Sequence, residues 1–410
     1  MNNYINDSNL AEGTKFYLEG GKTYYLANSV TLCKGLTLAT DPETLNNGRA
    51  KVYLNGLSEV DGTTQTANFM FGRSPQLGEL GAIYVGDLIF EDIDFDCPLA
   101  KNVGDGSASG NYFANMYSDG MAVSISSIQL RRCTFQRMIR GFVRVQGPNR
   151  KTFEEFVVED CLLYNCGYYS SDGRGYAWIE GDGKNAKSNI YKNMVFRRNT
   201  FYDSPRTCLF ADGNKDLNWG TDISYNITLE NNTFVNFSTR SKGRRLFEFR
   251  YLPGGSVITV ENNLFILTKQ DGDSRNLFME GMDVRQINGS GIITFNIKDN
   301  YSTNTNLTKG NIFSGSAFSA NKNSAGMWPE SCTYGKDELQ IKLGTNQISP
   351  TELMVNPNPP HMEGDPDVHE IDNLDGLYYQ NTDAVRNSDI YKYGIGAVSY
   401  THLRAHETAA

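Results

Sequence analysis

Residues 194–201 read Met-Val-Phe-Arg-Arg-Asn-Thr-Phe, and residues 227–234 read Ile-Thr-Leu-Glu-Asn-Asn-Thr-Phe. Both segments follow one template: two apolar positions separated by a variable one, then two variable positions, Asn or Cys, another variable position and Phe. Seven segments follow this template, with Ile93, Leu163 and Ser302 as the departures. They begin at Leu88, Ile128, Phe156, Met194, Ile227, Ile258 and Phe295. One repeated unit therefore dominates the chain, and a repeat of this kind decides the fold.

The template has a direct physical interpretation. Alternating apolar residues predict a strand with one face turned inward. The recurrent Asn is expected where the chain turns, because Asn tolerates the left-handed backbone conformation and hydrogen-bonds locally. Stacked copies can pair these Asn side chains along the stack, and the Phe can return to the core to stack on the next Phe. One copy cannot bury its own apolar face, so each copy needs neighbours.

The spacing of the template separates two β architectures. The interval between Asn or Cys positions varies from 28 residues, Cys133 to Cys161, to 40 residues, Ile93 to Cys133. Rungs of a β-helix keep their strands while their loops vary, whereas a β-sandwich has no reason to keep Asn at one place in successive strands. The sequence therefore predicts an all-β fold, a right-handed parallel β-helix (a solenoid) with Asn and Phe ladders and irregular loops.

The repeat also sets the expected domain organisation. Residues 1–397 are expected to form a single β-helix domain, with opening rungs over 12–56 and regular rungs over 83–302. Residues 303–397 lose the periodicity and are expected to be an irregular closing region and cap. Residues 398–410 look like a translated sequencing adapter, so we expect a non-native tail there.

Composition limits the classes of function. The chain has 410 residues, a net charge of −9 and 39% hydrophobic residues, which is enough for a real core. The acidic balance argues against general nucleic-acid binding, but it allows an anionic ligand on a local basic stripe. No apolar window could span a bilayer, and no signal peptide is recognisable. We expect a monomer whose seven Cys residues are mostly small buried groups.

The repeat texture over residues 12–397 resembles the pectate-lyase-like parallel β-helix superfamily. More narrowly, it is similar to β-helix proteins that gut Bacteroidetes encode in polysaccharide-utilisation loci. The resemblance implies export, to the cell surface, the periplasm or the extracellular space, with an export signal or lipoprotein anchor upstream of this sequence. It also implies a glycan ligand, often acidic. Because it rests on repeat texture, it concerns fold far more than activity.

A second strand after each Phe is expected to carry ladders of outward side chains. One outward column is expected to contain Arg144, Trp178, Phe210, Glu248 and Phe278. A second is expected to contain Gln146, Glu180, Asp212, Arg250 and Glu280. An arginine precedes each of these strands, namely Arg140, Arg174, Arg206, Arg244 and Arg275.

Stacked arginines would lie about 4.8 Å apart along the solenoid, and such like charges repel unless anions lie between them. Those anions are either carboxylates of the protein itself or carboxylates and sulfates of a bound glycan, which the planar guanidinium grips at two points. The outward aromatic rings favour the glycan, because sugar rings pack on them. Alternatively, loops of the protein itself cover these faces and shield the aromatic rings from solvent.

Three functions follow from this pattern. The first is a surface or secreted protein that binds polysaccharide, uronate or sulfated, along the ladders without cutting it. The second is a polysaccharide lyase acting by β-elimination, with Arg206 and Arg244 as the catalytic residues. The third is a structural or adhesive β-helix without a glycan site.

Cofactors and other chemistries receive little support. Asp212, Glu180 and Glu280 could hold Ca²⁺ in a lyase, but no calcium-binding motif accompanies them. A glycoside hydrolase would need two carboxylates at a set separation, and the polygalacturonase-like motifs are absent. His361 and His369 both fall in the expected cap, where we interpret them as solvated loop residues.

Overall fold

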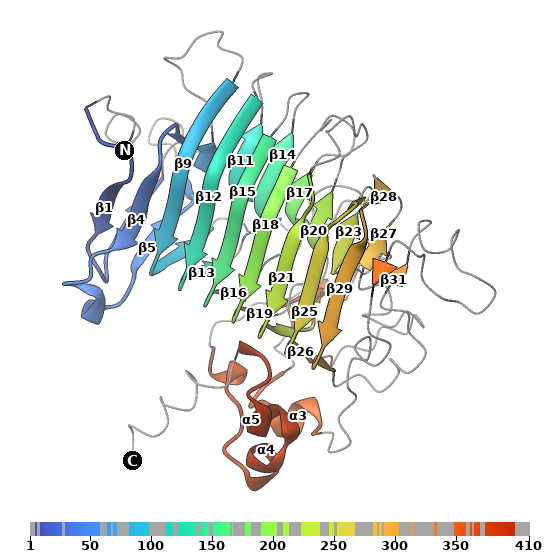
Figure 1. The fold of residues 1–410 in the computed structure, drawn as a ribbon. Helices are drawn as coiled ribbons and strands as arrows, with labels where there is room; N and C mark the ends of the chain where they lie inside the picture. Colours follow the sequence, from blue (N-terminus) through green and yellow to red (C-terminus); the bar gives the residue numbers. More distant parts are fainter. Residues whose placement is uncertain are drawn as a thin grey trace.

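The computed structural model shows a solenoid of stacked β-strands (Figure 1). It describes residues 5, 9–26, 29–57, 64–66, 69–71, 82–97, 112–117, 122–136, 138, 141–146, 151–164, 166, 177–181, 190–202, 208–212, 223–237, 246–249, 252–266, 282–284, 287–288, 291–302, 313–314, 332–333, 348–357, 361–362, 365–369 and 374–397.

Three parallel sheets form the solenoid. Sheet A contains, in spatial order, β1 (Thr14–Leu18), β4 (Leu36–Thr40), β9 (Ala82–Glu91), β12 (Ala122–Arg131), β15 (Lys151–Glu159), β18 (Ile190–Arg197), β21 (Asn226–Glu230), β25 (Val257–Glu261), β29 (Ile293–Lys298) and β32 (Cys332–Thr333). Sheet B contains β2 (Thr23–Tyr25), β5 (Ala50–Tyr53), β10 (Ile93–Asp96), β13 (Thr134–Gln136), β16 (Leu162–Tyr164), β19 (Thr200–Tyr202), β22 (Thr233–Val235), β26 (Leu264–Ile266) and β30 (Tyr301–Ser302). Sheet C contains β3 (Val30–Leu32), β8 (Phe69–Phe71), β11 (Tyr112–Tyr117), β14 (Gly141–Gln146), β17 (Ala177–Gly181), β20 (Cys208–Asp212), β23 (Phe247–Phe249), β27 (Met282–Val284) and β31 (Phe313–Ser314).

Small elements complete the described chain. The parallel pair β24 (Leu252–Pro253) and β28 (Ile287–Asn288) adds a short ladder. Two antiparallel pairs are β6 (Asn55–Leu57) with β7 (Thr64–Thr66), and β33 (His361–Met362) with β34 (Asp365–His369). The helical pieces are η1 (Leu45–Asn47), α3 (Pro350–Leu353), η3 (Asp375–Leu377), α4 (Asp383–Asn387) and α5 (Asp389–Tyr393).

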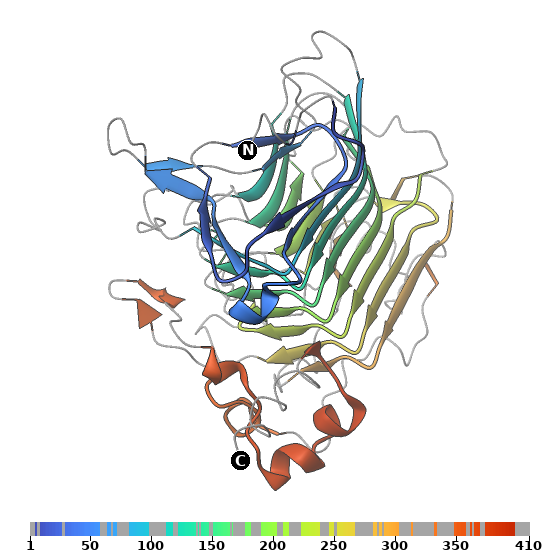
Figure 2. The same ribbon diagram turned by 90° about the vertical axis from the view of Figure 1, so that its left-hand side faces the viewer.

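The chain visits sheets A, B and C in turn, so each circuit forms one rung and pairs with the rung before it. The view in Figure 2 shows the sheets wrapped around a common interior. The predicted opening rungs are present, since β1 pairs with β4, and β2 with β5. The sequence prediction of an all-β parallel β-helix is confirmed.

The Asn ladder lies inside the solenoid, at the corner between sheets A and B. The Nδ2 atoms of Asn199, Asn232 and Asn263 each donate to Oδ1 of the Asn one rung later at 2.9 Å, ending at Asn300. All four side chains are at most 1% exposed. The same Oδ1 atoms also accept a hydrogen bond from the backbone N–H of the ladder Asn one rung earlier. Buried amides are therefore satisfied within the ladder itself.

The left-handed turn residue, however, is not the Asn of the template but the residue before it. Seven residues at this position have φ between 51° and 55°, namely Asp92, Arg132, Asp160, Arg198, Asn231, Asn262 and Asp299. The prediction that the template Asn itself takes this conformation is wrong. The preceding residue turns the backbone, and the Asn that follows is thereby directed into the interior.

The Phe ladder is confirmed as an interior stack. Ring centroids are 4.9 Å apart for Phe201 and Phe234 and 5.2 Å apart for Phe234 and Phe265, with nearly parallel planes. Phe95 and Phe135 stack at 5.4 Å, and Leu163 separates this pair from Phe201. Stacked rings of this size supply much of the apolar area that each rung buries.

Two Cys residues occupy the Asn position in the earlier rungs. Cys133 and Cys161 are free, buried thiols that lie in the ladder just before Asn199. The Cys161 thiol contacts the Leu130 carbonyl at 3.4 Å, and burial raises the pKa of this thiol. A thiol is a weaker donor than an amide, so the ladder is weaker here than in later rungs.

We expect Cys161→Asn to raise the free energy of unfolding by about 1 kcal/mol. The new amide would donate to the Leu130 carbonyl and to Oδ1 of Asn199, extending the ladder by one rung. Cys208→Asn is the matched control, because Cys208 is 4% exposed and lies outside the ladder. Chemical denaturation should show a gain at position 161 and a loss at 208. A loss at both positions would contradict the extension of the ladder.

The described C-terminal segment lies along the side of the solenoid, against the outer face of sheet B (Figures 1 and 2). The sheet residues in this contact are Tyr202, Val235, Leu264, Ile266 and Tyr301. The segment residues are Ile348, Leu353, Met354, Leu377, Tyr379, Val385, Ile390 and Ile395. The Tyr202 hydroxyl donates to the Asn356 carbonyl at 2.6 Å, which ties the segment to β19. The sequence predicted an irregular closing region and cap over 303–397. Within it, β31 and β32 extend sheets C and A, and the segment residues named above lie along a flank.

Candidate functional site

Sheet C is the sheet on which the sequence places its glycan-binding ladders. Several predicted site residues lie outside the described residues, namely Arg140, Arg174, Arg206, Arg244, Arg250, Arg275, Phe278 and Glu280. Arg144, Glu180 and Asp212 belong to described strands, so their backbone positions are known. The side chains of Trp178, Phe210 and Glu248 are described in full.

The predicted aromatic platform is wrong for both of its described members, because Trp178 and Phe210 are 0% exposed. The Trp178 ring packs on Phe142 at 4.9 Å and on Phe201 at 5.5 Å. The Phe210 ring contacts Tyr191 at 4.9 Å. Both rings therefore belong to the solenoid core, and neither is open to a sugar.

Different physical causes move the two aromatic side chains inward. Trp178 occupies the same column as Phe142, since Val143 pairs with Ile179. Phe142 and Val143 are adjacent yet both fully buried, so alternation fails where the rung bends into sheet C. Phe210 pairs with Ile179 rather than with Trp178. A one-residue change in register exchanges the faces of a strand.

The actual register creates a different polar column on sheet C. Arg144 pairs with Glu180, and Glu180 with Ala211. The column continues from Ala211 to Glu248 and then to Asp283. The structure thus brings Arg144, Glu180 and Glu248 into one column, which we call the sheet C polar column, together with Asp283, which the sequence did not suggest.

Two further predictions for this sheet are corrected, one by the register and one by side-chain burial. Asp212 pairs with Phe249 and lies outside the sheet C polar column. Glu248 lies in the column, but its side chain is only 5% exposed, so its carboxylate is covered rather than open to solvent. A buried carboxylate needs partners, because burial of a charge is costly without them.

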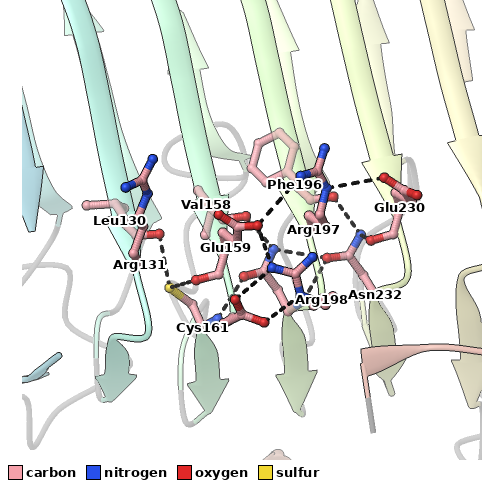
Figure 3. Close-up of polar contacts among 12 residues, drawn as sticks. Leu130, Arg131, Val158, Glu159, Cys161, Phe196, Arg197, Arg198, Glu230 and Asn232 are labelled. Carbon is pink, nitrogen blue, oxygen red and sulfur yellow. Dashed lines mark hydrogen bonds and ion pairs between the residues drawn. The ribbon is translucent and has the colours of Figure 1, made fainter. Parts of the chain in front are cut away.

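A second charged feature, missed at the sequence level, lies at the outer corner where sheet A ends. Its residues, which we call the corner charge ladder, are Glu91, Asp92, Arg131, Arg132, Glu159, Asp160, Arg197, Arg198, Glu230, Glu261 and Lys298. The first four rungs alternate between an acidic pair and an arginine pair. Figure 3 shows its central part, beside the ladder residues Cys161 and Asn232. The signal is visible in the sequence as Glu-Asp or Arg-Arg just before the Ile, Cys or Asn position of the first four template copies.

Ion pairs connect the rungs of the corner charge ladder. Arg132 grips the Asp92 carboxylate at two points, with a closest contact of 2.9 Å. Arg198 binds Asp160 in the same way from 2.7 Å. These hydrogen bonds raise the pKa of both guanidinium groups. Lys298 pairs with Glu261 at 3.3 Å. The side chains are partly exposed, so each pair contributes roughly 0.2–1 kcal/mol.

The charges of stacked arginines can be balanced by carboxylates of the protein or by anions of a bound glycan, and the corner charge ladder shows the first arrangement. Here the anions between the arginines are the protein's own carboxylates, as in the pairing of Arg197 with Glu230 at 3.2 Å. Cations already paired in this way are poor ligands for an external polyanion. The ladder is accordingly a structural feature, distinct from the sheet C polar column.

A metal centre and a membrane span are two further possibilities for the described part of the chain. There, no cluster of three His, Cys, Asp or Glu side chains is arranged to hold a metal ion. No helix among the same residues is long and apolar enough to cross a membrane. Comparisons of the chain with models of protein families, with curated proteins and with solved structures find no match.

Proposed function

We propose that this protein acts outside the cell, at its surface or in the periplasm, and binds an acidic polysaccharide along sheet C. The observation that supports the proposal is the sheet C polar column, in which Arg144, Glu180, Glu248 and Asp283 share one register column, with Ala211 between Glu180 and Glu248. Polar residues spaced at multiples of about 4.8 Å suit a ligand that is itself a linear repeat, and Arg144 is the member that would bind its anionic groups.

The arginines that precede the strands of sheet C strengthen this proposal. Arg140, Arg174, Arg206 and Arg244 each fall within three residues of the start of β14, β17, β20 or β23. Parallel strands begin at the same edge of their sheet, and each of these arginines, which lie outside the described residues, comes just before such a strand in the sequence. Uronate carboxylates or sulfates would neutralise their charges, and guanidinium groups bind such anions at two points.

Binding without cleavage is the function we favour. A polysaccharide lyase would need a base and a means of neutralising the uronate carboxylate, and Arg206 and Arg244 are the residues that could act in this way. Ca²⁺ held by carboxylates near sheet C would be the cofactor in that case. A structural or adhesive β-helix without a glycan site is the third possibility, and the experiment below distinguishes all three.

Affinity electrophoresis in gels cast with polygalacturonate, alginate or chondroitin sulfate tests the proposal. We expect one of these polymers to retard the wild-type protein, and Arg144→Ala to weaken the interaction by roughly tenfold. Arg132→Ala is the matched control, because it removes the same charge from the corner charge ladder, where the guanidinium is already paired with Asp92.

Each outcome of this experiment has a definite meaning. Retardation lost in Arg144→Ala but kept in Arg132→Ala supports binding along sheet C. Equal losses in both variants indicate a nonspecific charge effect and contradict the sheet C site. A rise in ultraviolet absorbance from an unsaturated uronate product, with or without Ca²⁺, indicates the lyase. If no polymer retards the protein and no product forms, the structural or adhesive role is the one that remains.

A further inference from the structure

The outer face of sheet B is divided into a covered half and an open half. From β19 to β30 the C-terminal segment buries the outward side chains, which are mainly apolar, such as Val235 and Ile266. In the first three rungs the same face carries aromatic and hydrogen-bonding side chains instead. The residues that we call the open sheet B face are Thr23, Tyr25, Arg49, Lys51, Tyr53 and Asp94, whereas Asp96, the register partner of Tyr53, is only 2% exposed.

A tyrosine pair forms the aromatic part of the open sheet B face. Tyr25 and Tyr53 are register partners on β2 and β5, with ring centroids 5.0 Å apart and planes at 82°. This edge-to-face contact holds the two rings in a fixed relative orientation. Tyr25 is nevertheless 65% exposed. An aromatic ring that is both oriented and open is suited to pack on the C–H face of a sugar, with its hydroxyl as a hydrogen-bonding group.

Cationic groups lie beside this tyrosine pair. The Arg49 guanidinium forms an ion pair with Asp94 at 3.6 Å and donates a hydrogen bond to the Thr134 hydroxyl at 3.1 Å. Lys51, between Thr23 and Asp94 in the register, is partly exposed and makes no side-chain ion pair with the described residues. Asp94, the acidic register neighbour of Lys51, lies 3.6 Å from Arg49, so the Lys51 ammonium is left to bind an anionic ligand beside the aromatic rings.

We propose that the open sheet B face is a second glycan-binding site, separate from sheet C, which takes a uronate-containing chain. The sugar rings would pack on Tyr25 and Tyr53, and Lys51 would bind a carboxylate of the same chain. The ligand class rests on the proposed function, whereas the site does not. A protein partner fits less well, because the described side chains of this face other than the tyrosines are hydrogen-bonding groups rather than an apolar core.

Two sites on different faces of one solenoid would have a measurable effect. A long polysaccharide bound at sheet C would have a raised effective concentration at the open sheet B face. A polymer should therefore bind more tightly than a short oligosaccharide, and the loss of either site should remove most of that advantage.

The test compares the double variant Tyr25→Ala/Tyr53→Ala with Tyr84→Ala/Tyr393→Ala in gels containing polygalacturonate, alginate or neutral galactan. Tyr84 on β9 and Tyr393 in α5 are 69% and 70% exposed and do not belong to the open sheet B face, so they control for loss of surface tyrosine. We expect the first double variant to bind a uronate polymer roughly tenfold more weakly and the control to bind like wild type. Lys51→Gln should weaken the binding of uronate polymers and leave that of galactan unchanged.

The failure of this site and the failure of the proposed function give different results. If Arg144→Ala weakens binding and Tyr25→Ala/Tyr53→Ala does not, the second site is wrong while sheet C stands. If the tyrosine variant weakens binding and Arg144→Ala does not, the open sheet B face is the principal site. Equal losses in both tyrosine double variants, or a wild-type protein that no polymer retards, would overturn this inference. Circular dichroism of each variant separates lost binding from lost folding.

Discussion

Replacement of Trp178 by Ala is expected to lower the free energy of unfolding by about 3–5 kcal/mol, as large-to-small changes of buried aromatic residues do. The Trp178 indole is 0% exposed and packs between the rings of Phe142 and Phe201. Its removal would leave a cavity at the bend into sheet C. Chemical denaturation followed by far-ultraviolet circular dichroism measures this loss.

Trp178→Phe is the matched control for this prediction. The buried indole Nε1 has no hydrogen-bond partner among the described residues, so phenylalanine keeps most of the packing and removes an unsatisfied donor. We expect a loss of about 1 kcal/mol or less, because the two effects oppose each other. If Trp178→Ala kept wild-type stability but lost polysaccharide binding, the residue would be an exposed binding platform and its burial in the core would be wrong.

The second large effect is expected at the Asn ladder, where Asn232→Gly should destabilise the fold by about 3–5 kcal/mol. Asn232 Oδ1 accepts from both the backbone N–H and Nδ2 of Asn199, and its own Nδ2 donates to Asn263. Removal of the side chain leaves buried donors without acceptors on one side and opens a gap in the interior.

The adjacent residue supplies the control for the ladder. Asn231 precedes Asn232 and has a φ of 55°, a conformation that glycine adopts without strain. Asn231→Gly should therefore change the stability by less than about 1 kcal/mol. Thermal or denaturant midpoints of the two variants give the comparison directly. Similar losses at both positions would mean that the hydrogen bonds of the ladder contribute little.

The repeat template explains why the fold could be predicted from the sequence. Its apolar alternation, its Asn and its Phe act within eight consecutive residues, so their consequences are local, and the ladders that stack Phe201 on Phe234 follow from repetition. The template does not specify which residue adopts the left-handed conformation at the turn. Arg198 and Asn231 share no side-chain chemistry, yet both adopt the left-handed conformation before the ladder residue.

The candidate site was harder to predict because loops of variable length precede the strands of sheet C. No residue at the start of these strands marks the register as Asn232 does in the template. The alignment that placed Phe210 beside Trp178 is therefore off by one residue, and this exchanges the inward and outward faces. Glu248 was predicted to face outward and is only 5% exposed, because side-chain burial depends on covering residues that no local pattern reveals.

The corner charge ladder makes odd and even rungs of the solenoid different from each other. Its first four rungs alternate as Glu91-Asp92, Arg131-Arg132, Glu159-Asp160 and Arg197-Arg198. Excision of the second, third or fourth of these rungs would set two acidic or two basic rungs side by side, which is unfavourable for neighbouring strands. Excision or duplication of two consecutive rungs would preserve every attraction. In this part of the molecule, length can therefore change in steps of two circuits, and a chain that pairs these four rungs one rung out of place brings like charges together at the corner.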